Sequence, residues 1–310
     1  MNRLRAWLQV RPMYWSADET FVMRFFFAIV LYFVAIHWEL SPSYAMVPKP
    51  NGLARLIPLG WMADSGLVGF FKPVVGLGLL AYILGLAPAV TLFPALLVGV
   101  GTGALRNSQG DISHHSQLAM MVLLAQWVVY VVHAVRVRSV TKVDEAVHSR
   151  AVWWSVMTIA AGYVASGIVK LKATDFQWIQ RVPVLAVQSI KANLSQYYST
   201  LVPAEGFKLT VVPDLIVKYP NVARLFFGTG LVLELLGFLL LLNRPMCRWF
   251  GVALLLMHVG IAFLMEIEFW NHMWLLLIFC VNAGEWLGLA KAKAAAAGKR
   301  GVKGKRGGAG

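Results

Sequence analysis

A lysine at the end of an apolar helical run is the strongest candidate for chemistry in this sequence. Lys170 lies in the run GYVASGIVKL, and at 3.6 residues per turn one helix face carries Tyr163, Ser166, Gly167 and Lys170. The glycine on this face allows a second backbone or a ligand to approach closely. A lysine in an apolar pocket can lose its charge near neutral pH, because burial penalises the ammonium, and a neutral amine is a competent base. The alternative is a lysine that extends to the lipid headgroups.

A pair of histidines precedes another apolar run. His114 and His115 stand in the segment DISHHSQLAMM. Neighbouring positions on a helix point about 100 degrees apart, so at most one of the two rings faces a bundle interior. That ring could donate a hydrogen bond to a developing oxyanion or transfer a proton. The alternative is that both rings lie in the hydrated interface while a neighbouring polar group caps the helix.

Two further ionisable residues lie inside apolar runs. Glu234 and His258 occupy positions where a charge is costly unless it has a partner. One interpretation pairs them with each other, so that they hold two helices in register. The other makes them a relay that connects one half of the membrane to a site near the opposite face.

Two carboxylates and an imidazole precede the last apolar run. This group contains Glu266, Glu268, Asn271 and His272, while His37 and Glu39 follow the first apolar run. The spacing matches no standard metal-ligand set. The sequence also contains no Gly-rich phosphate loop, no HExxH and no nucleophile-elbow motif, so nothing in it supports a hydrolase or a nucleotide-binding protein.

The composition defines the elements that must position these residues. The chain has 310 residues, of which 59% are hydrophobic and only 14% are charged, and this composition is typical of an integral membrane protein. The formal net charge of +14 is concentrated in the termini and loops, which favours membrane topology over nucleic-acid binding as its explanation. The expected partner is therefore the lipid bilayer. The fold class predicted is an all-α, polytopic transmembrane helix bundle.

Windows of about 18 to 20 apolar residues predict eight spans. They lie near residues 21–38, 67–86, 88–105, 116–135, 152–171, 224–242, 248–266 and 270–288. Pro88 and Pro94 leave open a re-entrant pair for the second and third of these. The pattern from Trp178 to Tyr198 predicts an interfacial helical segment between spans five and six. We expect one transmembrane domain over residues 1–288 and a disordered basic tail over 289–310.

Lysine and arginine residues near the span ends predict the orientation. With eight spans, four basic segments fall on one side of the membrane. They are the N-terminus, the loop after the fourth span, the loop after the sixth span and the C-terminal tail. That side should be the cytoplasm, which predicts a multi-pass protein of the inner membrane with both termini cytoplasmic and with Lys170 near the extracytoplasmic face. The first span should act as an anchor and not as a cleaved signal. Cys247 starts one span and Cys280 lies inside another, so we expect different depths and no disulfide.

Three segments, in this order, resemble a known membrane domain. HHSQL (114–118), YVASGIVKL (163–171) followed by Trp178, and MHVGIAFLMEIEF (257–269) are similar to elements of the vitamin K-dependent gamma-carboxylase and its bacterial relatives, the HTTM-domain proteins. The resemblance covers nearly the whole chain. In that family a lysine at this position is the base that deprotonates reduced vitamin K, so the resemblance implies this role for Lys170, and it implies that His115 assists the anionic intermediates.

The chain departs from this family in three ways. His114 replaces an asparagine and Ser166 replaces an alanine. The residues after the last apolar run are also too few for the large extramembrane domain with which the carboxylase holds its protein substrate. We therefore do not expect glutamate carboxylation.

Together these observations predict a membrane enzyme that acts on a lipophilic, quinone-like molecule or on a peptide. Lys170 would be the base, with His115 and His114 as hydrogen-bond donors. The predicted substrate-binding residues are Tyr163, Ser166, Gly167, His258, Glu234 and Trp178. The alternative is a noncatalytic accessory protein, comparable to the toxin-maturation proteins that share this domain. A small-solute carrier is less favoured, because only Glu234 and His258 lie near the membrane midplane, where carriers bind their substrates.

Overall fold

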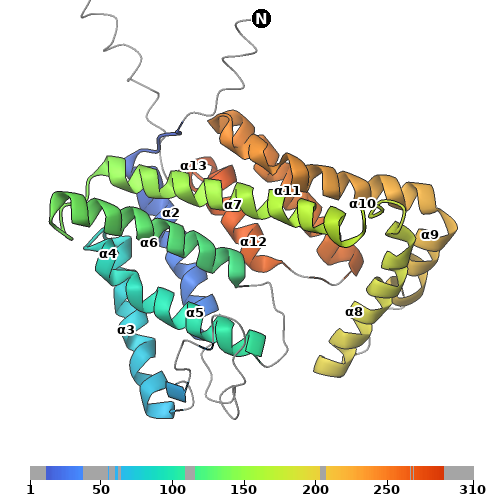
Figure 1. Cartoon of the computed structure of the whole chain (residues 1–310), viewed down its shortest axis with the longest axis horizontal. Helices are drawn as coiled ribbons and strands as arrows, with labels where there is room; N and C mark the ends of the chain where they lie inside the picture. Colours follow the sequence, from blue (N-terminus) through green and yellow to red (C-terminus); the bar gives the residue numbers. More distant parts are fainter. Residues whose placement is uncertain are drawn as a thin grey trace, which may run out of the picture.

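The computed structural model describes residues 12–37, 55, 60–61, 64–108, 116–202, 207–265, 267 and 269–289. All regular structure within these ranges is helical (Figure 1). The predicted all-α class is therefore confirmed for the described part of the chain.

Six of the described helical segments are long and apolar enough to cross a membrane. They are α2 (Ala17–Tyr32) with η1 (Phe33–His37), α3 (Ser65–Ile83), α6 (Gln117–Val137), α7 (Glu145–Ala173), α10 (Pro220–Leu235) with η7 (Leu236–Leu241), and α11 (Arg244–Met265). Two shorter apolar segments correspond to the predicted third and eighth spans: α4 (Pro88–Thr91) with α5 (Phe93–Ser108), and α12 (Trp270–Leu275) with η8 (Leu276–Val281). The fold is a multi-pass membrane bundle, and the number of eight spans stays a prediction.

Polar caps define where α2 and α7 begin. At the start of α2, Ser16 and Glu19 form a capping box, in which each side chain accepts a hydrogen bond from the other residue's backbone N–H. Asp144 accepts from the backbone of Val147 and so starts α7 at Glu145, well before the predicted boundary at residue 152. Hydropathy alone placed the polar first turns of α7 outside the helix.

The segment between α3 and α6 is bent. Pro94 has no backbone N–H to donate into the preceding turn, and the helix is interrupted at Leu92, between α4 and α5. The bend requires a small residue on the neighbouring helix, because a Cβ added at Gly78 of α3 would lie 2.5 Å from the carbonyl oxygen of Thr91.

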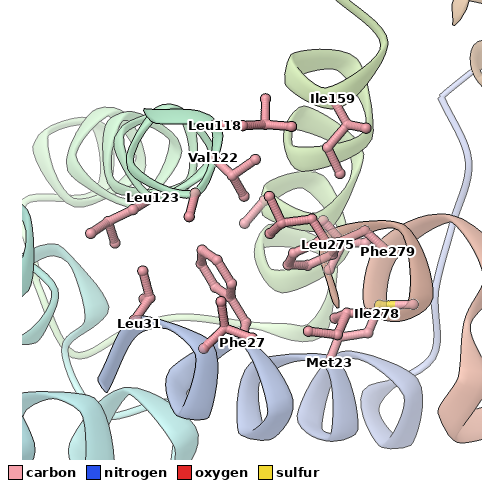
Figure 2. Packing of buried hydrophobic residues seen from close by; sticks show 14 of the residues in the cluster. Met23, Phe27, Leu31, Leu118, Val122, Leu123, Ile159, Leu275, Ile278 and Phe279 are labelled. Carbon is pink, nitrogen blue, oxygen red and sulfur yellow. The ribbon is translucent and has the colours of Figure 1, made fainter. Parts of the chain in front are cut away.

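The main core lies where α2, α6, α7 and the α12–η8 segment converge (Figure 2). Phe27 of α2 and Phe279 of η8 meet edge to face, with ring centroids 5.2 Å apart. The side chains around them are Met23, Leu31, Leu118, Val122, Leu123, Ile159, Leu275 and Ile278. The short α12–η8 segment is thus an integral part of the core.

A second, smaller core joins the helices that follow α7. These are η5 (Val182–Val184), α8 (Leu185–Thr200), η6 (Phe207–Val211) and α9 (Val212–Lys218). Ala186 of α8 is buried in one cluster with Ile216 of α9 and Phe227 of α10. The segment predicted to be interfacial is therefore helical, and its position relative to a bilayer stays a prediction.

Hydrogen bonds define the two ends of the bundle. At one end, the backbone of Trp15 donates to Ser149 and that of Ala17 donates to Glu145, so the starts of α2 and α7 lie together. Arg244, at the start of α11, forms an ion pair with Glu19 at this same end. Lys170 is near the far end of α7, on the opposite side, as the alternation of spans predicts.

Candidate functional site

The site is centred on an ion pair between α7 and α10. The Lys170 Nζ atom lies 2.6 and 2.7 Å from the two carboxylate oxygens of Glu234. The lysine side chain is 37% exposed, whereas that of the glutamate is 7% exposed, so the amine forms the outer, reachable part of the pair. The Ser166 hydroxyl donates to the same carboxylate at 3.4 Å.

Small residues bring the two helices close enough for this pair to form. A Cβ at Gly167 would lie 2.9 Å from Leu235 Cδ2 and 3.2 Å from the Leu235 backbone nitrogen. A Cβ at Gly237 would lie 2.9 Å from Tyr163 Cβ. The residues that follow Glu234 form the 3₁₀ segment η7, an irregularity that often accompanies functional positions within long helices.

A buried imidazole forms the inner part of the site. The hydroxyl of Tyr163 and Nε2 of His258, in α11, are 2.7 Å apart. The rings of Phe269 and His272 lie 5.2 and 5.7 Å from the His258 ring. The other ring nitrogen, His258 Nδ1, is buried and has no hydrogen-bond partner among the described residues. A buried polar atom without a partner is costly, so this atom marks a place for a further polar group.

A tryptophan forms the outer wall. The ring of Trp178, in the turn that follows α7, has its centroid 5.9 Å from Lys170 Nζ. A cation this close to the face of an indole is attracted by the electron density of the ring. The amine therefore lies between a carboxylate and an aromatic surface.

The four residues predicted to share one face of α7 all face the neighbouring helices α10 and α11. Tyr163 faces His258, Gly167 packs against Leu235, and Ser166 and Lys170 both contact Glu234. We use the term amine site below for Tyr163, Ser166, Lys170, Glu234 and His258.

Two interpretations of these residues are wrong. Glu234 does not pair with His258, because both side chains turn toward α7 and find different partners there. Lys170 is not in an apolar pocket, since two carboxylate oxygens and an indole surround the amine. His114, His115, Glu39, Glu266 and Glu268 lie outside the described residues, as does the side chain of His37.

A second buried polar cluster was missed at the sequence level. Arg24 of α2 is 8% exposed, and its Nη1 atom lies 3.1 Å from Nε2 of His148 in α7. The hydroxyl of Tyr130, in α6, is 2.9 Å from Nδ1 of the same imidazole. An arginine inside an apolar run was the available signal, but His148 precedes residue 152, where the fifth span was predicted to begin.

A separate chain of buried polar groups joins α3, α6 and α7. Tyr82 donates to Gln126 at 2.6 Å, and Gln126 donates to Ser155 at 2.8 Å. All three side chains are buried and hydrogen-bonded, which indicates that they fix the packing of α3, α6 and α7.

The opposite end of the bundle holds a network that we call the charged end. It consists of Glu19, Arg244, Arg248, Asn282 and Glu285. Arg244 pairs with Glu19 and lies 3.5 Å from Glu285, Arg248 pairs with Glu285, and the Asn282 amide donates to both carboxylates. Nearby, a hydrogen bond to Glu145 raises the pKa of Tyr14 to about 12.

The two cysteines lie beside this network. Cys247 and Cys280 are free and buried, and both line one small hollow together with Arg244 and Arg248. The expectation that they lie at different depths is therefore wrong. Cys280 lies in η8, near the end of the last apolar segment, and this end lies beside the start of α11, where Cys247 is located.

The chain matches no protein-family model, no curated protein and no solved structure. The fold and composition define it as a multi-pass, all-α membrane protein. The amine site is therefore the feature of the described residues that bears most directly on function.

Proposed function

We propose that this chain is a membrane enzyme of the HTTM type, in which Lys170 binds and deprotonates a lipophilic, weakly acidic molecule such as a quinol. The observation that carries the proposal is the geometry of the Lys170–Glu234 pair. Its carboxylate is buried, while its amine is partly exposed beside the face of Trp178. An aromatic, lipid-soluble ligand could stack on the indole and place an acidic hydroxyl against the amine.

Glu234 is the group to which the Lys170 ammonium would pass its proton. The Nζ atom contacts both carboxylate oxygens, so a proton can move between the two groups along an existing hydrogen bond. In the neutral form of the pair, the amine can accept a proton from the ligand. The product is an anionic ligand beside a new ammonium ion, and the attraction between these charges stabilises it.

Tyr163 and His258 would then stabilise the anionic ligand or transfer its proton. The Tyr163 hydroxyl lies on the same face of α7 as Lys170 and is hydrogen-bonded to the imidazole. Together with His258 Nδ1, which has no partner among the described residues, it can donate a hydrogen bond to an anion or carry a proton inward. The predicted roles of His115 and His114 as donors stay part of this proposal.

Binding of duroquinone and of its reduced form tests the proposal. The protein in lipid nanodiscs would be titrated with each compound, and quenching of tryptophan fluorescence would be measured. We expect Lys170→Ala to weaken binding of the reduced form at least about tenfold, since a hydrogen bond to a charged group is lost.

Lys172→Ala is the matched control, because Lys172 is an exposed lysine near the same end of α7. It should leave binding unchanged. Unchanged affinity in Lys170→Ala, or an equal loss in both variants, would refute the assignment of Lys170.

The alternative function is a noncatalytic accessory subunit that binds a peptide or a second membrane protein. The close contacts at Gly167 and Gly237 favour it, because small residues at a helix interface with a satisfied polar pair are typical of structural packing. Purification under mild conditions separates the two functions. An accessory subunit should retain a protein partner, whereas an enzyme of lipophilic substrates should retain a quinone that the Lys170→Ala variant loses.

A further inference from the structure

A groove on the outer surface of the bundle lies far from the amine site. It has a volume of about 580 Å³, and its walls are Ala89 and Val90 of α4, Val131, Ala134 and Val135 of α6, and the loop 138–140. Its size falls within the range of small-molecule sites. The indole of Trp127 holds α4 against α6 beside it, by donating a 2.9 Å hydrogen bond to the carbonyl of Ala89.

The groove changes character along its length. The part between α4 and α6 is entirely aliphatic, and Val90 and Val135 are 56% and 71% exposed. The other end holds Arg138 and Ser139, where α6 terminates. An apolar channel that leads to a cation at a helix end matches the two parts of a phospholipid, whose acyl chains are apolar and whose phosphate is charged.

The charge at this end is uncompensated. No acidic residue lines the groove, and the exposed Arg138 side chain has no ion pair or hydrogen bond with any described residue. The Ser139 hydroxyl is 3.3 Å from that of Thr141 and keeps capacity for a further hydrogen bond. The C-terminus of α6 repels an anion through the helix dipole, so the attraction must come from the guanidinium.

The backbone at Arg138 has a left-handed conformation that disfavours most side chains. Arg138 caps α6 with φ of 52°, a left-handed conformation for which glycine is strongly preferred. A glycine here would favour the turn. Leu201 ends α8 in the same conformation, so the backbone alone does not single out Arg138, whereas its place in the lining of the groove does.

We infer that this groove is a binding site for an anionic phospholipid, with the acyl chain between α4 and α6 and the phosphate on Arg138 and Ser139. The lipid would stabilise the break between α4 and α5 by packing against it. The site is independent of the amine site, which lies at the other end of the bundle.

Titration with phosphatidylglycerol tests the inference. The protein in neutral detergent would be titrated with phosphatidylglycerol or phosphatidylcholine, and the bound lipid would be counted by native mass spectrometry. We expect Arg138→Gly to weaken phosphatidylglycerol binding at least about tenfold, because a charged hydrogen bond is lost. The same variant should be at least as thermostable as the parent in phosphatidylcholine, since glycine relieves the left-handed strain.

Three comparisons decide the outcome. Arg136→Ala removes an equal charge from a residue of α6 that does not line the groove, and it should change the affinity less than twofold if the site is specific. Ala134→Trp keeps the charge but fills the channel, so it should also abolish binding. Inorganic phosphate should not compete.

The inference fails if Arg138→Gly retains the preference for phosphatidylglycerol. It also fails if Arg136→Ala loses as much affinity as Arg138→Gly, which would indicate diffuse attraction. Competition by inorganic phosphate would indicate a site for a free anion instead of a lipid.

Discussion

The two ends of the bundle stabilise their buried charged groups in different ways. At the charged end, two carboxylates, two guanidinium groups and an amide are joined in one network. At the amine site, one carboxylate holds one amine, and an imidazole nitrogen has no partner among the described residues. Saturated networks are typical of structural roles, whereas under-satisfied groups beside an exposed amine are typical of sites that bind something.

The difference in exposure supports the same distinction. Glu19 is 1% exposed and closes a capping box as well as an ion pair, so the first turn of α2 depends on it. The Lys170 side chain is 37% exposed, and among the described residues its ion pair is with Glu234 alone. We therefore expect the charged end to control stability and the amine site to control ligand binding, and four substitutions test that contrast.

The largest effect should come from Glu19→Gln. This change leaves Arg244 without its nearest carboxylate and weakens the capping box. Removal of one partner of a fully buried pair costs about 3–5 kcal/mol, and we expect about 2–4 kcal/mol here because Arg244 is 29% exposed. Unfolding in mixed micelles with increasing SDS measures the loss. Quinol affinity, measured on the fraction that stays folded, should not change.

Lys170→Met should have the next largest effect. It leaves the buried Glu234 carboxylate without a counter-charge, which should cost about 1–3 kcal/mol. The double variant Lys170→Met/Glu234→Leu removes both charges and should recover stability to within about 1 kcal/mol of the parent, as replaced buried pairs commonly do. Ligand binding should be lost in both variants. If the double variant binds the quinol, the pair is structural and the contrast between the two ends disappears.

The sequence predicted the face of α7 correctly because helical periodicity is a local property. The spacing of Tyr163, Ser166, Gly167 and Lys170 is enough to place them together on any straight helix. The rotation of α10 and α11 about their own axes is not local, and it turns Glu234 and His258 toward α7 and away from each other. Pairings between helices therefore could not be derived from hydropathy and spacing.

Errors in the predicted helix boundaries misplaced several buried polar residues, although the type of secondary structure was predicted correctly. The predicted start of the fifth span at residue 152 omitted His148, although Asp144 caps the helix about two turns before that residue. As a result, the Arg24–His148–Tyr130 cluster was missed. The two cysteines were misplaced for a similar reason, since the last apolar helix ends at Val281 and not at 288.

Gly167→Ala tests the close packing that brings the amine to its carboxylate. The added methyl group would lie 2.9 Å from Leu235 Cδ2 and 3.2 Å from the Leu235 backbone nitrogen, so α10 must move. We expect a loss of about 1–3 kcal/mol together with weaker quinol binding. Gly76→Ala in α3 is the matched control, because no atom lies within 4 Å of the added carbon. That substitution should stabilise the helix slightly, and a similar loss in both variants would contradict the role given to Gly167.

The smallest change in stability should come from Tyr163→Phe. The substitution removes one hydrogen bond to His258 and should cost about 1 kcal/mol. Tyr82→Phe removes a comparable bond, to Gln126, from a site that we regard as purely structural. If Tyr163 binds or relays protons to the ligand, the Tyr163 variant should weaken quinol binding by about fivefold or more, whereas the Tyr82 variant should not, although their unfolding midpoints fall by similar amounts. Parallel losses of stability and binding in the two variants would mean that the imidazole only supports the packing of α7 against α11, and the active part of the site would then reduce to the amine and its carboxylate.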